Sequence, residues 1–357
     1  MLFKKDYTDF PSPKRQLHFA KKIIVVDGMI GGGKSLLSSV ISSLPNVEMW
    51  LMRPQIEQIV ALYHLDHISL EGAKALINTW MDEEIYNQNI SRNINFKPSD
   101  ATSVFQYARP LKYLNRLFKN PLDAKESMET ENSILNIATH VITSYAKPLF
   151  EALGENLVYI RFCRHPMTAY MLKINANWTE RWEKDGRHGQ ILYKSFDQKS
   201  NQINLPFYAK DIEKAYLNSN SIDRAILLFD QWIRSSDNFI DNIKTKTKAT
   251  IFEIPYEKFV FQPDAYIAKI ASSLGVKPDS KTLKMMRKQG VPRNSLDDAP
   301  KNKYFTDMGW KSPQKKLTLA ENFAEGRDYA IKTASEQSVR MLDKLASEYQ
   351  IRHNISI

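Results

Sequence analysis

The sequence predicts an α/β fold in which a mostly parallel sheet lies between two layers of helices, with helical insertions. Short apolar segments rich in β-branched residues alternate with longer helical segments along the 357 residues. Strands that alternate with helices build a parallel sheet that is covered on both faces. A second observation, a glycine-rich turn between the first strand and the first helix, supports the same fold.

That turn, residues 28–35, reads GMIGGGKS and fits the phosphate-binding pattern G-x-x-x-x-G-K-[ST]. The pattern is typical of P-loop NTPase-like three-layer sandwiches. A backbone that curls around a polyphosphate must point several N–H groups inward, and side chains would block that approach. We therefore expect a nucleotide to be bound by Gly28, Met29, Ile30, Gly31, Gly32, Gly33, Lys34 and Ser35.

Two residues of the turn carry specific chemistry. Lys34 is expected to neutralise charge between the β- and γ-phosphates, and Ser35 to bind Mg²⁺ through its hydroxyl. The helix that follows directs its positive end toward the anion. The alternative is a plain connecting turn in which Lys34 lies on the surface and Ser35 caps the helix.

The other elements follow in order along the chain. Strands are expected at 22–27, 47–52, 133–139, 156–163 and 249–256. Helices are expected at 36–44, 144–153, 222–242, 265–274 and 318–350.

Two insertions are expected outside the sheet. The first, 54–130, is helical in period over 54–92 and 110–128, and the second, 174–215, is polar, aromatic and irregular. Residues 291–316 form a basic loop with three prolines. The predicted domains are an N-terminal extension at 1–20, one P-loop domain at 21–316 and a C-terminal helical segment at 317–357.

Ligands of parallel sheets bind beyond the carboxyl ends of the strands. Gly28, His140 and Arg164 each follow a predicted strand, so we expect them at the same edge. His140 is the candidate base for a substrate hydroxyl, and its alternative is a structural histidine that caps the next helix. Arg164 could clamp a phosphate with its planar fork, and its alternative is an ion pair that shapes a loop.

Other candidates are weaker. Arg181, Arg187 and His188 could form a lid that closes over phosphates, although a solvated loop is the favoured interpretation for each. Asp27 and Glu48 could organise Mg²⁺ or act as a base, but a structural role is favoured for both.

The aromatic and sulfur-bearing residues point to a core. Trp178, Trp182 and Trp232 are expected to be core aromatics rather than platforms for a base. The single cysteine, Cys163, lies in an apolar segment and is expected to be a buried small hydrophobe rather than a nucleophile. The pattern contains no Cys/His cluster with zinc spacing.

The composition limits the class of protein and the kinds of partner that can be expected. The chain is 43% hydrophobic and 25% charged, an ordinary globular balance. Its net charge of +10 suits an anionic substrate, an acidic membrane surface or nucleic acid, but no RNA- or DNA-binding module is recognised. No segment approaches the roughly 18 apolar residues of a transmembrane span, and the basic N-terminus lacks the apolar core of a signal peptide. We therefore expect a cytoplasmic protein, while the oligomeric state is left open.

The turn at 28–35 resembles the P-loop of small-molecule kinases, especially the deoxynucleoside kinase type, which reads acid-G-N-I-G-x-G-K-S. Asp27 stands where that type often has Glu. The downstream acidic-arginine-serine signature of those kinases is absent from the sequence.

Later segments resemble the sulfotransferase family, which shares a P-loop sheet. Thr139 and His140 resemble its T-H segment, whose His is the catalytic base. Three further segments resemble its strand with R-x-P, its Y-E-D-L segment and its G-x-W-K segment: IRFCRHPMTAYML at 160–172, FEIPYEKFVFQPDAYIAKIASSLGV at 252–276 and YFTDMGWKSP at 304–313. Together these resemblances cover about residues 22–312 in the family's order.

The sequence also departs from that family. Sulfotransferases usually have a K-S-G-T-T type loop, and Gly31 stands in the place of that lysine. The family has a serine eight residues after the arginine of R-x-P, and the two grip a 3′-phosphate. The equivalent residues are Arg164 and Leu172, and leucine cannot donate a hydrogen bond.

We therefore predict a sulfotransferase-like fold that uses ATP or GTP with Mg²⁺, most simply a kinase that phosphorylates a hydroxyl of a small molecule or glycan. Its catalytic residues would be Lys34, His140 and Arg164, and the acceptor could be anionic. The first alternative is a sulfotransferase that uses 3′-phosphoadenosine 5′-phosphosulfate (PAPS), with His140 as its base. The second is a nucleotide-binding regulatory ATPase or GTPase.

Overall fold

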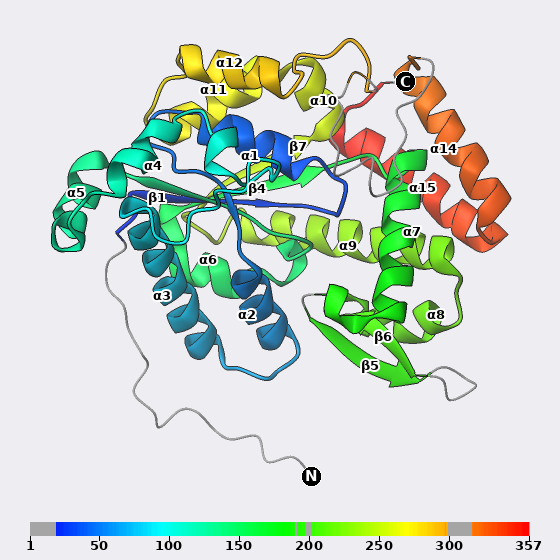
Figure 1. Ribbon diagram of the computed structural model, residues 1–357. Helices are drawn as coiled ribbons and strands as arrows, with labels where there is room; N and C mark the ends of the chain where they lie inside the picture. The colour runs from blue at the N-terminus through cyan, green and yellow to red at the C-terminus, as the bar shows by residue number, and fades with distance from the viewer. Residues whose placement is uncertain (1–18, 190, 197–201, 297, 299–315, 357) are drawn as a thin grey trace.

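The computed structural model describes residues 19–189, 191–196, 202–296, 298 and 316–356. Five parallel strands form the central sheet in the order β2-β3-β1-β4-β7 (Figure 1). Their bounds are Lys22–Asp27 for β1, Leu51–Met52 for β2, Ile134–Ala138 for β3, Leu157–Cys163 for β4 and Thr250–Pro255 for β7. Val26 of β1 lies opposite Ala138 on one side and Ile160 on the other. The predicted α/β fold with a parallel sheet is confirmed.

Helices cover both faces of this sheet (Figure 1). Successive residues of β1 face opposite layers, so both sides of the strand are apolar. Val26 faces the layer of α1 (Lys34–Ser42), α10 (Tyr256–Phe261), α11 (Pro263–Ser273) and α12 (Ser280–Lys288). Val25 faces the layer of α2 (Pro54–His64), α3 (Leu70–Asn89), α6 (Lys147–Leu153) and α9 (Ser221–Ile243). The architecture is therefore a three-layer sandwich.

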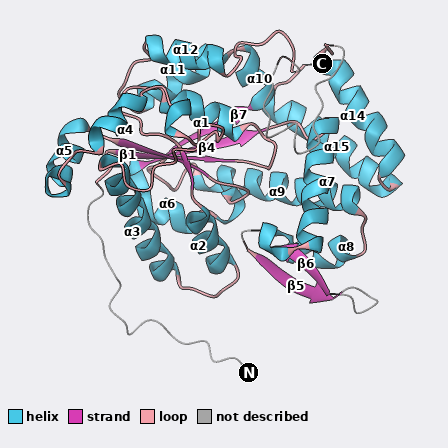
Figure 2. Ribbon diagram, viewed as in Figure 1, coloured by secondary structure: helices cyan, strands magenta, loops and turns pink. Residues whose placement is uncertain are grey.

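A third apolar core lies beside the sandwich. It is built from α7 (Ala169–Lys184), one end of α9, β6 (Gln202–Pro206), α14 (Leu319–Thr333) and α15 (Glu336–His353). The helix α8 (Glu213–Leu217) adds Tyr216, and β5 (Leu192–Phe196) pairs antiparallel with β6 in a hairpin apart from the central sheet (Figure 2). These elements place α7 against the phosphate-binding turn.

The expectation of an irregular segment at 174–215 is wrong. Most of its first third belongs to α7, and the rest contains the β5–β6 hairpin and α8. The N-terminus of α7 is capped by Thr168, whose side chain accepts a hydrogen bond from the N–H of Met171. Its buried face mixes apolar and polar side chains, among them Asn175 and Thr179, and this mixture hides the helical period.

Other boundaries differ in detail. Within 47–52 only Leu51–Met52 is a strand, and Val47 adds one isolated bridge to β3. The segment 110–128 contains α4 (Pro110–Arg116) and the start of α5 (Ala124–Glu131), separated by a turn at Pro121. The C-terminal segment is broken between α14 and α15 at Ser335, which caps α15.

Some expectations fall largely on residues that the structure does not describe, namely the extension at 1–20, the loop at 291–316 and the segment 304–313. Within the part of the chain that is described, no helix is both long and apolar enough to cross a membrane.

Candidate functional site

The backbone conformation of the turn at 28–35 depends on two glycines with positive φ, Gly31 and Gly33. Gly33 lies at φ 91°, a left-handed conformation that residues with a Cβ rarely adopt. A Cβ on Gly33 would also lie 2.7 Å from the ring of Tyr256. The helix α1 begins directly after this residue, so its N-terminus points into the turn.

Lys34 fills the inside of the turn. It is the first residue of α1 and is buried, and its Nζ donates hydrogen bonds of 2.8 Å to the carbonyl oxygens of Gly28 and Met29. Burial lowers the pKa of Lys34 to about 8, although the carboxylates of Asp27 and Glu57 oppose this shift. The ammonium group therefore lies inside the turn, against two of its carbonyl oxygens.

Asp27 closes the base of the turn. Its Oδ1 accepts a hydrogen bond from the hydroxyl of Thr139 at 3.0 Å, and its Oδ2 accepts from the N–H of Thr143 at 2.9 Å. The N–H of Ile142 and the hydroxyl of Thr143 add further bonds. Because both oxygens are occupied by the segment after β3, Asp27 is placed for the structural role that the sequence favoured.

His140 follows β3 and is held by a carboxylate from α2. Oε1 of Glu57 lies 2.8 Å from the backbone N of His140 and 3.0 Å from its ring Nδ1. Glu57 is buried, whereas about a quarter of the His140 side chain is exposed. The next residue, Val141, donates its N–H to the carbonyl oxygen of Gly28 at 3.3 Å. The candidate base and the glycine-rich turn are therefore adjacent.

Glu57 is a site residue that the sequence reasoning missed. It lies in the first turn of α2 next to Ile56, whose side chain packs in the core. An acidic residue on the buried face of a helix is unusual, because a carboxylate is almost never fully buried without a partner. That anomaly was the available signal, but the sequence alone does not identify His140 as the partner.

Arg164 follows β4 and lies against the turn from the other side. Its Nη1 donates to the carbonyl oxygen of Gly31 at 3.1 Å. Its guanidinium lies between the rings of Tyr170 and Tyr256, 4.5 and 4.2 Å from their centroids. Its Nε is buried and has no hydrogen-bond partner among the described residues. The Arg164 guanidinium therefore contacts two rings and one carbonyl oxygen and is available to bind an anion. This geometry differs from the loop-shaping ion pair that was the alternative interpretation.

The start of α7 lies directly over the turn. A Cβ on Gly31, which has φ 79°, would lie 2.9 Å from Cγ2 of Ile174 and 3.2 Å from the ring of Tyr170. Asn175 donates from Nδ2 to the carbonyl oxygen of Ile30 at 3.1 Å. Leu172 is fully buried in the third core. Thus Gly31 has no room for a longer side chain, and a serine at position 172 would lie among apolar side chains.

The proposed lid residues are placed differently. Arg187 is 90% exposed and pairs with Asp185 in its own turn, and His188 is exposed beside it. Arg181 lies over the ring of Trp178, 5.5 Å from its centroid. The contacts described for these residues are therefore with α7 and its C-terminal turn rather than with residues 28–35.

The remaining candidates belong to the interior. Trp182 and Trp232 are buried in the third core, and Trp178 packs against it. Cys163 is buried, and burial raises the pKa of its thiol to about 12. Burial alone would raise the pKa of Glu48, but Lys112, Arg116 and Tyr113 lower it to about 2, so its charge belongs to a structural network.

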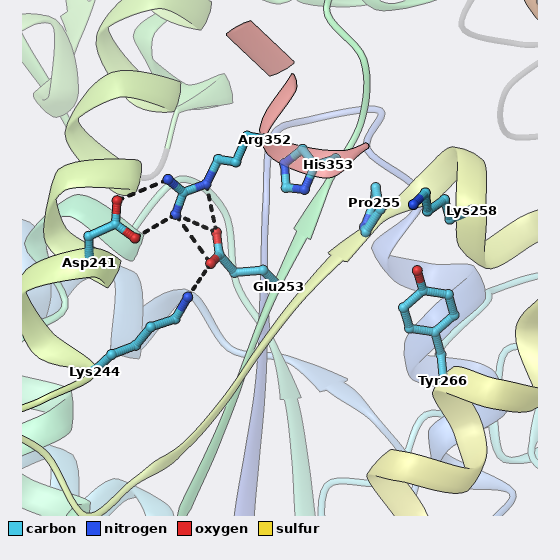
Figure 3. A pocket seen from close by; sticks show the side chains of 8 residues that line it. All are labelled: Asp241, Lys244, Glu253, Pro255, Lys258, Tyr266, Arg352 and His353. Carbon is cyan, nitrogen blue, oxygen red and sulfur yellow. Dashed lines mark hydrogen bonds and ion pairs between the residues drawn. The ribbon is translucent and has the colours of Figure 1, made fainter. Parts of the chain in front are cut away.

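A cavity of about 420 Å³ lies away from these residues, beside the outer strand β7 (Figure 3). Arg352, near the end of α15, donates to both Asp241 and Glu253, and Lys244 also reaches Glu253. Lys258 and Tyr266 line the opposite wall. Because most of its charges are paired with one another, this cluster fastens α15 to α9 and β7.

Comparison with known proteins finds a distant likeness to several solved structures. No protein-family model matches the sequence, and no curated protein matches it. The sulfotransferase domain of the olefin synthase of Synechococcus PCC 7002 is 14% identical, with a TM-score of 0.42 over 95% of this chain and 98% of that chain. The sulfotransferase domain of the curacin biosynthetic pathway is 14% identical, with a TM-score of 0.41 over 93% and 99%.

Sulfotransferase STF9 from Mycobacterium avium is 12% identical, with a TM-score of 0.42 over 96% of this chain and 79% of that chain. These structures belong to the family that the later motifs of the sequence resemble. At such low identity the likeness is distant, so the function proposed below rests on this chain's own residues.

Proposed function

We propose that this protein is a group-transfer enzyme that binds a nucleotide donor at residues 28–35 and transfers an anionic group to a hydroxyl. The observation that carries the proposal is the meeting of three strand ends around one turn. These ends bring Lys34, His140 and Arg164 together with the N-terminus of α1. Two cations and a base around a phosphate-binding turn are the groups that such a transfer requires.

We propose sulfuryl transfer from PAPS as the reaction. The acceptor oxygen forms a bond to the sulfur, and the bond between sulfur and the bridging oxygen of the phosphosulfate breaks. His140 takes the hydroxyl proton through Nε2, and the leaving adenosine 3′,5′-bisphosphate keeps the electron pair. Lys34 and the N–H groups of the turn stabilise the negative charge that develops on the leaving oxygen.

The carboxylates near the turn support this donor over a nucleoside triphosphate. P-loop enzymes that cleave triphosphates hold Mg²⁺ with the Ser or Thr of the loop and an Asp from a neighbouring strand. In this chain both oxygens of Asp27 are occupied, and the neighbouring strand β3 is followed by Thr139 and His140.

Phosphoryl transfer from ATP or GTP with Mg²⁺ is the second candidate. Lys34 and Ser35 occupy the triphosphate positions of the loop, and the space over Gly31 is filled by α7, so a sulfotransferase-type lysine has no place there. Ser35 would be the Mg²⁺ ligand, and the three catalytic residues would be unchanged. Glu57, which lies near Lys34 and His140, would be the carboxylate available as a second Mg²⁺ ligand.

Ligand binding separates the two candidates. A thermal-shift titration of the whole chain compares adenosine 3′,5′-bisphosphate with ADP in the presence of Mg²⁺. A larger stabilisation by the bisphosphate supports sulfuryl transfer, and stabilisation by ADP–Mg²⁺ alone overturns it in favour of the kinase. Lys34→Ala should abolish the shift, whereas Lys332→Ala, at an exposed position of α14, should keep it.

A regulatory ATPase or GTPase predicts a different result. It would hydrolyse nucleotide without an acceptor, and His140→Ala would leave that turnover unchanged. Loss of all acceptor-dependent turnover in His140→Ala would instead support the base role.

A further inference from the structure

Glu57 contacts His140 twice with one oxygen atom. Its Oε1 lies 2.8 Å from the backbone N and 3.0 Å from the ring Nδ1, although the two residues are 83 positions apart. A cap of the turn would need only the backbone hydrogen bond. The second bond fixes the rotation of the imidazole ring, which a turn cap does not require.

We infer that Glu57 is a positioning residue that holds His140 as the Nδ1–H tautomer, with Nε2 free to accept a proton from the acceptor hydroxyl. This inference rests on the proposed function. A carboxylate can only accept a hydrogen bond, so the proton of the neutral ring must lie on Nδ1. Nε2 then carries the lone pair, and it has no partner among the described residues.

The surroundings of Glu57 suit this role. Pro54 begins α2, and the neighbouring side chain of Ile56 packs in the core under the sheet, so the carboxylate stands on a rigid support. The carboxylate is almost completely buried, and hydrogen bonds to a charged acceptor are stronger where water is excluded. When His140 takes the proton, the carboxylate stabilises the imidazolium.

Glu57 also connects the base to the donor side. The negative charge of Glu57 raises the pKa of Lys34 and so partly offsets the lowering caused by burial. Tyr208, from the segment after β6, is buried within the electrostatic reach of the same carboxylate. The titratable side chains that Glu57 contacts or acts on are therefore His140, Lys34 and Tyr208.

The first test reads the tautomer directly and needs no turnover. Two-bond ¹H–¹⁵N NMR spectra of the full chain, labelled in its histidines and assigned with His140→Gln, report which ring nitrogen carries the proton. We expect Nδ1–H in the wild type and a mixture of tautomers in Glu57→Leu and Glu57→Asp. An Nε2–H tautomer in the wild type, or an Nδ1–H signal that persists in both variants, overturns the inference.

The second test measures how the two residues depend on each other. Glu57→Gln should lower kcat by roughly 10²-fold, which is in the range of lost base catalysis. His140→Ala combined with Glu57→Gln should be no slower than His140→Ala alone, because both changes remove the same function. Additive losses in the double variant overturn the inference.

Glu126→Gln, at an exposed position of α5, is the matched control and should leave kcat unchanged. If no donor gives turnover in the wild type, the proposed function fails, while the NMR result still decides how Glu57 holds the ring.

Discussion

Nη1 of Arg164 donates a hydrogen bond to the carbonyl oxygen of Gly31, across 133 positions of the sequence. This bond ties the end of β4 to the middle of the turn that follows β1. It also keeps the guanidinium against the ring of Tyr256, which in turn lies against Gly33. The turn at 28–35 is thus held by residues that follow β4 and β7, and five predictions are given below.

Donor binding should depend on the protonation of Lys34. Its pKa is lowered to about 8 by burial, and an anion in the turn favours the charged form. The Kd for adenosine 3′,5′-bisphosphate should therefore be constant below about pH 8 and rise by up to about tenfold per pH unit above it. Isothermal titration from pH 6.5 to 9.5 checks this, and a constant Kd across that range would contradict it.

The lowered pKa of Lys34 also predicts how the free energy of unfolding changes with pH. Between pH 8 and 10.5 the folded chain holds fewer protons on Lys34 than the unfolded chain does. This group's contribution therefore makes the free energy of unfolding rise with pH across that window. Lys34→Met should remove the rise in urea unfolding series, whereas the exposed control Lys332→Met should keep it.

Gly31→Lys should fail to restore a sulfotransferase-type loop. The new Cβ would lie 2.9 Å from Ile174 at a φ of 79°, so α7 would have to move. We expect a loss of at least about 2 kcal/mol in the free energy of unfolding, from crowding and backbone strain together. Urea unfolding measures the loss of stability, and titration with adenosine 3′,5′-bisphosphate measures donor binding. A stable variant that binds the bisphosphate more tightly would show that α7 does not fill the space over Gly31.

Leu172→Ser should destabilise the chain without improving its grip on a 3′-phosphate. Leu172 is fully buried among apolar side chains, so the change leaves a cavity and a hydroxyl without a solvated partner. We expect a loss of about 3–5 kcal/mol in the free energy of unfolding. Leu283→Ser, at an exposed position of α12, is the matched control and should lose far less. Tighter bisphosphate binding by Leu172→Ser would show that position 172 faces the donor after all.

Acid should weaken the fold through Glu48. Its pKa is about 2 in the folded chain and 4.5 as the ordinary value, because Lys112 and Arg116 outweigh the cost of burial. Its stabilising contribution is therefore complete above pH 4.5 and is lost as the pH falls toward 2. In Glu48→Gln the free energy of unfolding should be lower at pH 7 and should change less between pH 5 and 3. Parallel slopes for the variant and wild type in chemical denaturation would contradict this prediction.

Several features of the site were predictable because they are local. A β-branched segment, a glycine-rich turn and a capped helix follow one another within residues 22–44, so the sequence indicates a strand, a phosphate-binding turn and a helix directly. His140 and Arg164 were expected at the same edge as the turn because the strands of a parallel sheet end together. The structure places both beside it.

Other features were decided by packing between elements. The pairing of Glu57 with His140 depends on where α2 crosses the edge of the sheet, and the stacking of Arg164 depends on α7 and α10. The position of Leu172 inside a core, rather than facing a donor, follows from the contacts of α7 with α9 and α14.

The sequence by itself therefore determined the class of fold, the glycine-rich turn at 28–35 and the edge of the sheet at which chemistry is expected. The periods of strands and helices, and the conformations that glycine permits, act over a few neighbouring residues and can be recognised in one segment. Only the tertiary structure decided that Glu57 contacts His140 and that α7 closes the space over Gly31. Those contacts join residues that are more than 80 positions apart, and their geometry depends on how whole helices pack against the sheet.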